Sequence, residues 1–356
     1  MMKNKKGLRI GIVAAIVMAS VIMLTQCFSN HGNANGTSMI IEVSKEAIEK
    51  ASEKELDNIM SRCCQVLEKR IQLFCEEEPG LDKAKFSIKR VSDSERIQID
   101  FTNEELGQDQ IARIVKLLQS HGCLQFYETY YFCELCDYFY KANVRLAEKD
   151  SLYQAIDKDD FRFLLEGPLY DLLKPNFKQE APGQYSPERN ARIGVAQVKD
   201  TIAINQMLIE TRDLFPHDLK LAWTVKPEIV DDNEVLGLIA LKLSHDNKCA
   251  LNGEAISDAR LEYSSYNGEP EILIMMNNEG AKTWQRITGN NIGRQIAIVF
   301  DGYVYFYPVV TSEIPNGRAT ISGGNMTTEE AINLANILKA GMLPVPVTGV
   351  EQITKQ

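Results

Sequence analysis

The chain has 356 residues, which is enough for a sizeable hydrophobic core and for more than one domain. Its composition is that of a globular protein, with 44% hydrophobic and 25% charged residues, and its formal net charge is -10. This acidic balance argues against a protein that binds nucleic acid through a basic surface.

The N-terminal residues have the order of an export signal or a membrane anchor. Four basic side chains precede an apolar run over residues 10–24; they are Lys3, Lys5, Lys6 and Arg9. Two interpretations of residues 1–28 remain open: a retained signal anchor, or a lipoprotein signal in which Cys27 carries the lipid. Gln26 is bulky for the position before a lipidated cysteine. In both cases residues 29–37 form a polar tether, and the body is expected on one side of the membrane, opposite the cytoplasmic basic end.

Residues 38–129 show the alternation of a small α/β unit. Apolar spacing predicts strands over 39–43, 85–91, 96–101 and 124–127, and amphipathic helices over 54–74 and 103–118. The resulting order, β-α-β-β-α-β, is that of the split βαβ or ferredoxin-like pattern. We therefore expect an α+β fold.

Residues 251–352 repeat the pattern. Strands are expected over 271–276, 295–300, 303–309 and 320–322, with a terminal, Pro-containing strand over 343–350 at a sheet edge. Asp301-Gly302 predicts a tight hairpin, and Asn278 is expected to cap a helix that ends at residue 287. Thr327 and Glu330 predict a capping box for a helix that ends near Ala340. Residues 38–129 and 251–352 are thus expected to form a ferredoxin-like base built from both ends of the chain.

Residues 130–250 lie between these two parts and differ from them in sequence character. They are expected to form an inserted α+β head subdomain. Strands are predicted over 192–198, 219–225 and 235–243, with a helix over 200–214. Aromatic side chains gather at the start of the segment, and four of them are candidates for binding unfolded polypeptide: Tyr131, Phe132, Tyr138 and Phe139. The alternative is that these rings, at helical spacing, belong to the core of the head.

The C-terminal half resembles the SecD family of protein-export subunits. The residues that carry the resemblance are 275–282, 290–302, 317–323, 328–331 and 334–346, together with the earlier segments 66–71, 78–79 and 215–220. The resemblance extends loosely over residues 38–352. It implies the family's first periplasmic domain, with a ferredoxin-like base and an inserted head. It also implies a role in the late steps of export through the Sec channel.

Two departures from the family qualify this expectation. The family's Gly-rich, Asp-containing motif is replaced near residues 29–37, and Cys75 stands where the family has a Gly. The later membrane helices, which carry the family's proton-conducting acids, would follow Gln356, so no proton pathway is expected within this sequence.

Candidate catalytic or metal centres are weak. Cys133 and Cys136 form a single CxxC without a second pair or a thioredoxin-like context, and structural thiols are the simpler interpretation. We expect no enzyme activity, no cofactor and no metal.

The expected partners are the Sec translocon or related membrane subunits, unfolded exported polypeptide, and the membrane itself through the N-terminal anchor. The alternative is a diverged paralogue that acts as an envelope scaffold or interaction protein.

Overall fold

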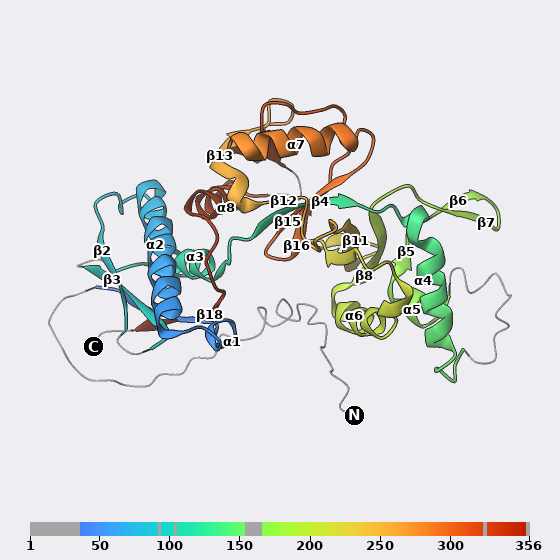
Figure 1. Ribbon diagram of the computed structural model, residues 1–356, viewed down its shortest axis with the longest axis horizontal. Helices are drawn as coiled ribbons and strands as arrows, with labels where there is room; N and C mark the ends of the chain where they lie inside the picture. Colours follow the sequence, from blue (N-terminus) through green and yellow to red (C-terminus); the bar gives the residue numbers. More distant parts are fainter. Residues whose placement is uncertain (1–35, 92–93, 103–104, 154–165, 323–325, 354–356) are drawn as a thin grey trace.

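The computed structural model describes residues 36–91, 94–102, 105–153, 166–322 and 326–353. Mixed α/β structure extends along one axis, with an N-terminal unit at one end and a helix-rich unit at the other (Figure 1). Within these ranges, no helix combines the length and the apolar composition that a membrane crossing requires. Residues 1–35 lie outside the described ranges. They include Cys27 and most of the predicted tether.

The N-terminal unit is a four-stranded antiparallel sheet with three helices, of which α2 is the longest. The strand order is β18-β1-β3-β2, from Val347–Ile353, Ser38–Val43, Arg96–Thr102 and Lys85–Arg90. The helices are α1 (Lys45–Ile48), α2 (Glu53–Glu77) and α3 (Gln108–Gln119). Ser52 begins α2 with a reciprocal capping box to Glu55. Alternate residues of β1 and β3, including Met39, Ile41 and Ile99, are fully buried beneath the helices.

The strand that closes this sheet comes from the far end of the chain. We expected residues 124–127 to close it, and this expectation is wrong. β4 (Leu124–Thr129) pairs instead with β11, β12 and β15, whereas β18 pairs along the whole of β1. The predicted position of the terminal strand at a sheet edge is confirmed.

A nine-stranded sheet occupies the middle of the molecule and continues toward the helix-rich end. Its main path is β16-β15-β4-β11-β8-β5, and β9, β10 and β12 pair onto its members. Besides β4, the bounds are β5 (Lys174–Pro175), β8 (Arg192–Gln197), β9 (Leu219–Trp223), β10 (Glu228–Val230), β11 (Asn233–Lys242), β12 (Leu251–Asn252), β15 (Ile296–Phe300) and β16 (Tyr303–Phe306). The sheet therefore joins strands from both sides of the predicted boundary at residue 250.

A three-stranded sheet holds the remaining C-terminal strands in the order β13-β14-β17, from Ile256–Tyr263, Pro270–Met276 and Arg318–Ile321. Helices α7 (Asn278–Asn290) and α8 (Thr328–Ala340) accompany it (Figure 1). The capping box of Thr327 and Glu330 is confirmed, but α7 is capped by Asn277 rather than Asn278. Because β15 and β16 join the nine-stranded sheet, the C-terminal part does not form a second complete βαββαβ sheet as expected.

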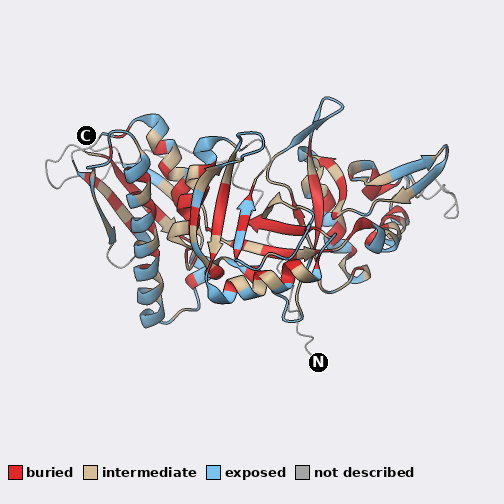
Figure 2. Cartoon of the chain, turned by 90° about the horizontal axis from the view of Figure 1, so that it is seen from above, coloured by how far each residue is buried: buried red, intermediate tan, exposed pale blue. Residues whose placement is uncertain are grey.

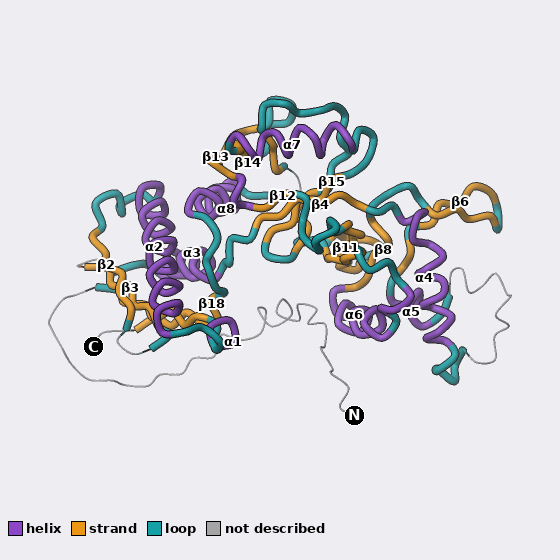
Figure 3. The backbone as a smooth tube through the Cα atoms, viewed as in Figure 1, coloured by secondary structure: helices purple, strands orange, loops and turns teal. Residues whose placement is uncertain are grey.

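The helix-rich end carries α4 (Phe132–Ala147), α5 (Pro168–Leu172) and α6 (Thr201–Glu210), which lie near one another in Figure 3. Short 3-10 helices η2 (Val198–Asp200) and η3 (Arg212–Leu214) flank α6, and η4 (Gly253–Ala255) follows β12. A two-stranded ribbon, β6 (Phe177–Ala181) and β7 (Gln184–Pro187), projects from this end (Figure 1).

Buried residues occur along the whole length of the molecule (Figure 2), and their side chains form two large clusters. The larger core joins the N-terminal unit to the C-terminal strands and helices, and the second core lies under α4, α5 and α6. A smaller third cluster lies around Tyr127, Ile239 and Val299 in the nine-stranded sheet.

A fully buried arginine ties α2 to the ends of two other helices. Arg70 Nη1 donates to the carbonyl oxygens of Leu117 (2.9 Å) and Ser120 (2.5 Å), at the end of α3. Its Nη2 donates to His121 O (3.3 Å) and to Gly341 O (3.1 Å), just past α8. Helix C-termini present unpaired carbonyl groups and a partial negative charge, so the guanidinium satisfies both ends at once.

The predicted Asp-Gly hairpin is confirmed and is attached to the same region. Asp301 and Gly302 have φ of 48° and 89°, as a two-residue hairpin turn between β15 and β16 requires. The Asp301 carboxylate accepts hydrogen bonds from Cys123 N (2.8 Å) and Ser120 Oγ (2.7 Å). The hairpin tip is therefore fixed to the segment that follows α3.

Candidate functional site

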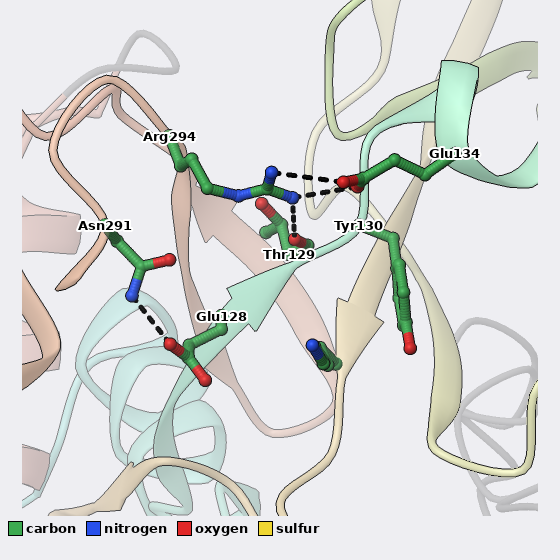
Figure 4. A pocket seen from close by; sticks show the side chains of 7 residues that line it. Glu128, Thr129, Tyr130, Glu134, Asn291 and Arg294 are labelled. Carbon is green, nitrogen blue, oxygen red and sulfur yellow. Dashed lines mark hydrogen bonds and ion pairs between the residues drawn. The ribbon is translucent and has the colours of Figure 1, made fainter.

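A small polar pocket lies where β4 leads into α4, beside the loop that follows α7 (Figure 4). It has a volume of about 240 Å³ and is lined by Glu128, Thr129, Tyr130, Glu134, Lys242, Asn291 and Arg294. Its walls come from segments far apart in the sequence, so the pocket depends on the packing of the loop at 291–295 against the start of α4.

A bidentate ion pair forms one wall of the pocket. Arg294 donates from Nη1 and Nη2 to the two carboxylate oxygens of Glu134, at 3.1 and 2.8 Å, and Nη2 also donates to Thr129 O at 3.0 Å. Glu134 in turn accepts from Tyr131 N (2.7 Å) at the first turn of α4. Two parallel hydrogen bonds between a guanidinium and a carboxylate fix the relative position and orientation of the two side chains. The pair therefore attaches α4 to the 291–295 loop.

These contacts set the charge states of the pair. Burial alone would raise the pKa of Glu134, but the hydrogen bonds from Arg294 and Tyr131 N outweigh it and hold this pKa below its usual range. The hydrogen bond to Glu134 likewise raises the pKa of Arg294. Both groups are charged at neutral pH, and they neutralise one another.

Tyr131 is buried and lies close to two guanidinium groups. Its ring lies 4.3 Å from the Arg294 guanidinium and 5.4 Å from that of Arg189, and its hydroxyl donates to Gly293 O at 2.9 Å. Guanidinium groups over an aromatic face are attracted by the ring quadrupole. Tyr131 therefore strengthens the same junction that the ion pair forms.

The opposite wall is built on Asn291 and Glu128. Asn291 is 4% exposed, and its Nδ2 donates to Glu128 Oε1 (2.6 Å) and to Ile287 O (2.9 Å) (Figure 4). Across the strand pair, Lys242 of β11 lies directly opposite Glu128 of β4. The Lys242 ammonium lies 5.3 Å from the ring of Tyr130. Acidic and basic groups thus face the same small space.

Tyr130 contributes an aromatic wall with a fixed hydroxyl. Its hydroxyl lies 3.0 and 2.9 Å from the two carboxylate oxygens of Asp218 and donates to that carboxylate. Burial, assisted by this hydrogen bond, raises the pKa of Tyr130 to about 12. The phenol is therefore neutral at physiological pH.

The structure separates the four aromatic candidates. Phe132 and Phe139 are fully buried and Tyr131 is 3% exposed, whereas Tyr138 is 36% exposed. Phe139 packs edge-on against Phe215, with ring centroids 4.9 Å apart, in the core of the helical unit. Only Tyr138 of the four offers an accessible ring here, and polypeptide binding by it stays a prediction. It lies one helical turn beyond Glu134, on the pocket side of α4.

The two cysteines of the CxxC motif differ in exposure. Cys133 is exposed, Cys136 is half-buried, and burial raises the pKa of the Cys136 thiol to about 11, which disfavours the reactive thiolate. No cluster of three or more His, Cys, Asp or Glu side chains suited to a metal ion occurs among the described residues. The Gly323-Gly324 turn and the lipidation candidate Cys27 lie outside those residues.

Sequence reasoning did not identify Glu128, Glu134, Asn291 or Arg294 as site residues. Asn291 and Arg294 fall within the segment that carried the SecD resemblance, which was the available signal. Nothing in the local pattern indicated that this segment would contact residues 128–134, since that contact depends on the pairing of β15 with β4.

Comparison with known proteins supports the resemblance found in the sequence. The family described as the SecDF P1 head subdomain matches residues 238–345. This stretch begins inside β11 and includes residues 251–345, nearly all of the C-terminal part that we had assigned to the base, so the predicted domain boundary at 250 stays a prediction.

Similar proteins include two annotated SecD subunits. The protein translocase subunit SecD of Rhodothermus marinus is 40% identical over 163 residues, 45% of this chain and 26% of that protein. The SecD subunit of Calditerrivibrio nitroreducens is 32% identical over 187 residues, 51% of this chain and 35% of that protein. The chain thus matches only about a quarter to a third of the length of these relatives.

Among solved structures, one described as a membrane component SecDF that enhances protein export is 20% identical, with a TM-score of 0.46. That match covers 90% of this chain and the whole of the other. The family match and the curated relatives overlap the segments that carried the resemblance, and over those residues the chain is similar to SecD and SecDF proteins.

Proposed function

We propose that this chain assists Sec-dependent protein export as a SecD-like periplasmic body tethered to the membrane by its N-terminal segment. In this role it binds translocating polypeptide or the Sec complex and catalyses no reaction. The match of residues 238–345 to the SecDF P1 head subdomain is the observation that carries the proposal. We further propose that the β18-β1-β3-β2 sheet with α2 and α3 serves as the ferredoxin-like base, because its strand order is the one this fold uses.

The pocket and Tyr138 are the surface that we assign to polypeptide contact. Tyr138 combines an accessible ring with a position one turn from Glu134, and tyrosine supplies a large contact area with few rotatable bonds. Glu134, one turn before Tyr138 on α4, belongs to the polar lining of the pocket, and an aromatic contact beside polar groups is typical of interfaces.

Site-specific photocrosslinking tests this assignment. A photoreactive amino acid replaces Tyr138 in the full chain, and membranes are isolated with a secretory protein stalled in the Sec channel. Tyr266 serves as the matched control because it is 96% exposed but lies on the distant turn between β13 and β14. We expect adducts with the stalled chain at position 138 and none at position 266.

The absence of adducts at both positions, together with normal export after deletion of the protein, would contradict the proposal. That result would favour the envelope scaffold instead. Adducts at position 266 alone would retain polypeptide binding but remove the pocket side of α4 as its site.

A further inference from the structure

The orientation of the Asn291 amide is fixed by its hydrogen bonds. Both amide protons have acceptors, since Nδ2 lies 2.6 Å from Glu128 Oε1 and 2.9 Å from Ile287 O. A flipped amide would place its oxygen against these two acceptors, so the observed orientation is the only one that both acceptors allow. The amide oxygen of this nearly buried residue therefore points into the pocket (Figure 4).

Glu128 presents a second acceptor to the same space. Only one of its carboxylate oxygens bonds to Asn291, and the side chain forms no ion pair within the part of the chain that the structure describes. Arg294, a partly exposed cation of the pocket, is already engaged by both oxygens of Glu134. The pocket thus holds one negative charge that has no basic partner at contact distance.

We propose that this pocket receives the lysine or arginine side chain of a polypeptide bound to the head. The ammonium or guanidinium donates to Glu128 and to the Asn291 amide oxygen, and the Tyr130 ring borders its apolar stem. Two converging acceptors suit a group with several N–H donors and repel a carboxylate. This inference rests on the proposed function, because the guest side chain belongs to the polypeptide that the body handles.

The position of Lys242 allows a test of whether the bound side chain is a cation or an anion. This exposed lysine lies opposite Glu128 and is the nearest basic side chain across the strand pair. A cationic guest competes with it for the same carboxylate, so removal of Lys242 should strengthen binding. An anionic guest would instead need Lys242, and its removal should then weaken binding.

The experiment measures fluorescence anisotropy of a labelled, unstructured Gly/Ser peptide with spaced lysines, titrated with the full chain. A peptide with norleucine at each lysine position is the neutral counterpart. We expect Glu128→Gln to weaken lysine-peptide binding about tenfold, the loss of one charged hydrogen bond. We expect Lys242→Met to tighten it about threefold, as for removal of an exposed competing charge.

Variants with the same charge changes elsewhere control for net charge. Glu279→Gln and Lys282→Met alter an exposed ion pair of 3.0 Å on α7, and neither should change the affinity. Lys242 is exposed, so its substitution tests the proposal even if Glu128→Gln disturbs folding.

Three results would overturn the inference: unchanged affinity in Glu128→Gln, weaker binding in Lys242→Met, or equal binding of the lysine and norleucine peptides. In the last case polypeptide binding itself would stand and only the cation pocket would be wrong. Failure of both peptides to bind would contradict the proposed function as well.

Discussion

The two ends of the molecule acquire their cores in different ways. At the N-terminal end the sheet is completed by β18, more than 200 residues after its neighbour β1, and the core mixes both ends of the chain. At the helical end, all the fully buried core residues fall between Phe132 and Ala240, within one continuous segment. The first end depends on long-range closure, and the second can form its core from local sequence.

Polar side chains link separate segments at both ends of the molecule. The long-range junctions carry specific polar links, Arg70 between α2, α3 and α8, and Arg294 between the C-terminal loop and α4. The helical end has a buried polar link of its own, because Asn143 of α4 accepts hydrogen bonds from Leu169 N (3.0 Å) and Tyr170 N (3.4 Å). Apolar packing is tolerant of partner identity, whereas a buried polar group needs donors or acceptors in a specific arrangement.

The largest effect is expected at Arg70. Arg70→Ala removes the partner of four carbonyl oxygens and leaves a cavity, which should lower the free energy of unfolding by about 4 kcal/mol. Denaturant unfolding followed at the N-terminal unit measures the loss. Arg62→Ala, an exposed position on the same helix, should change it by less than about 0.5 kcal/mol. Equal behaviour of the two variants would show that the buried arginine does not hold this end together.

A substitution in the contiguous core should act on the other end alone. Phe139→Ala removes a fully buried ring and should destabilise the helical unit by about 3 kcal/mol. Hydrogen exchange should then show faster exchange in α4 and α6, with β1 and β3 unchanged. The neighbouring Tyr138→Ala should cost less than about 1 kcal/mol because its ring is partly exposed. Faster exchange of β1 and β3 in Phe139→Ala would mean that the two cores unfold as one.

The smallest effect concerns the ion pair between Glu134 and Arg294. Since the folded pKa of Glu134 lies below its unfolded value of about 4.3, the pair stabilises fully above that pH and loses its effect as pH falls through the folded pKa. Glu134→Gln should cost about 1 kcal/mol or less at pH 7, because the pair is partly exposed. Unfolding measured from pH 7 to pH 3 should show the gap between variant and wild type closing. A gap that widens with acid would contradict the assigned charge state.

The sequence predicted local structure well and long-range pairing poorly, for a physical reason. The α2 periodicity, the capping box at Thr327 and the turn at Asp301-Gly302 depend on residues within a few positions of one another. Whether β4 or β18 becomes the fourth strand of the N-terminal sheet depends on which of them pairs with β1, and that pairing is set by tertiary packing. Residues 124–127 and 347–353 both have apolar patterns, and periodicity cannot rank them.

In the candidate site, too, local features were predictable from the sequence and long-range contacts were not. Tyr131 and Tyr138 were identified from composition, but composition could not tell the buried ring from the accessible one. The pocket residues Glu128, Asn291 and Arg294 come from β4 and from the loop before β15, and the pairing of those strands brings them together. Such a site becomes visible only when the strand partners are known.

The return of the chain to its first sheet is the central claim of this account, and a pair of engineered cysteines tests it directly. Ile40 of β1 lies opposite Glu351 of β18, so Ile40→Cys with Glu351→Cys should crosslink on mild oxidation. Ile40→Cys with Gln125→Cys in β4 should not, because β4 lies in the other sheet. Peptide mass mapping of the full chain identifies the bridged pair. A bridge from position 40 to position 125, with none to position 351, would contradict the account.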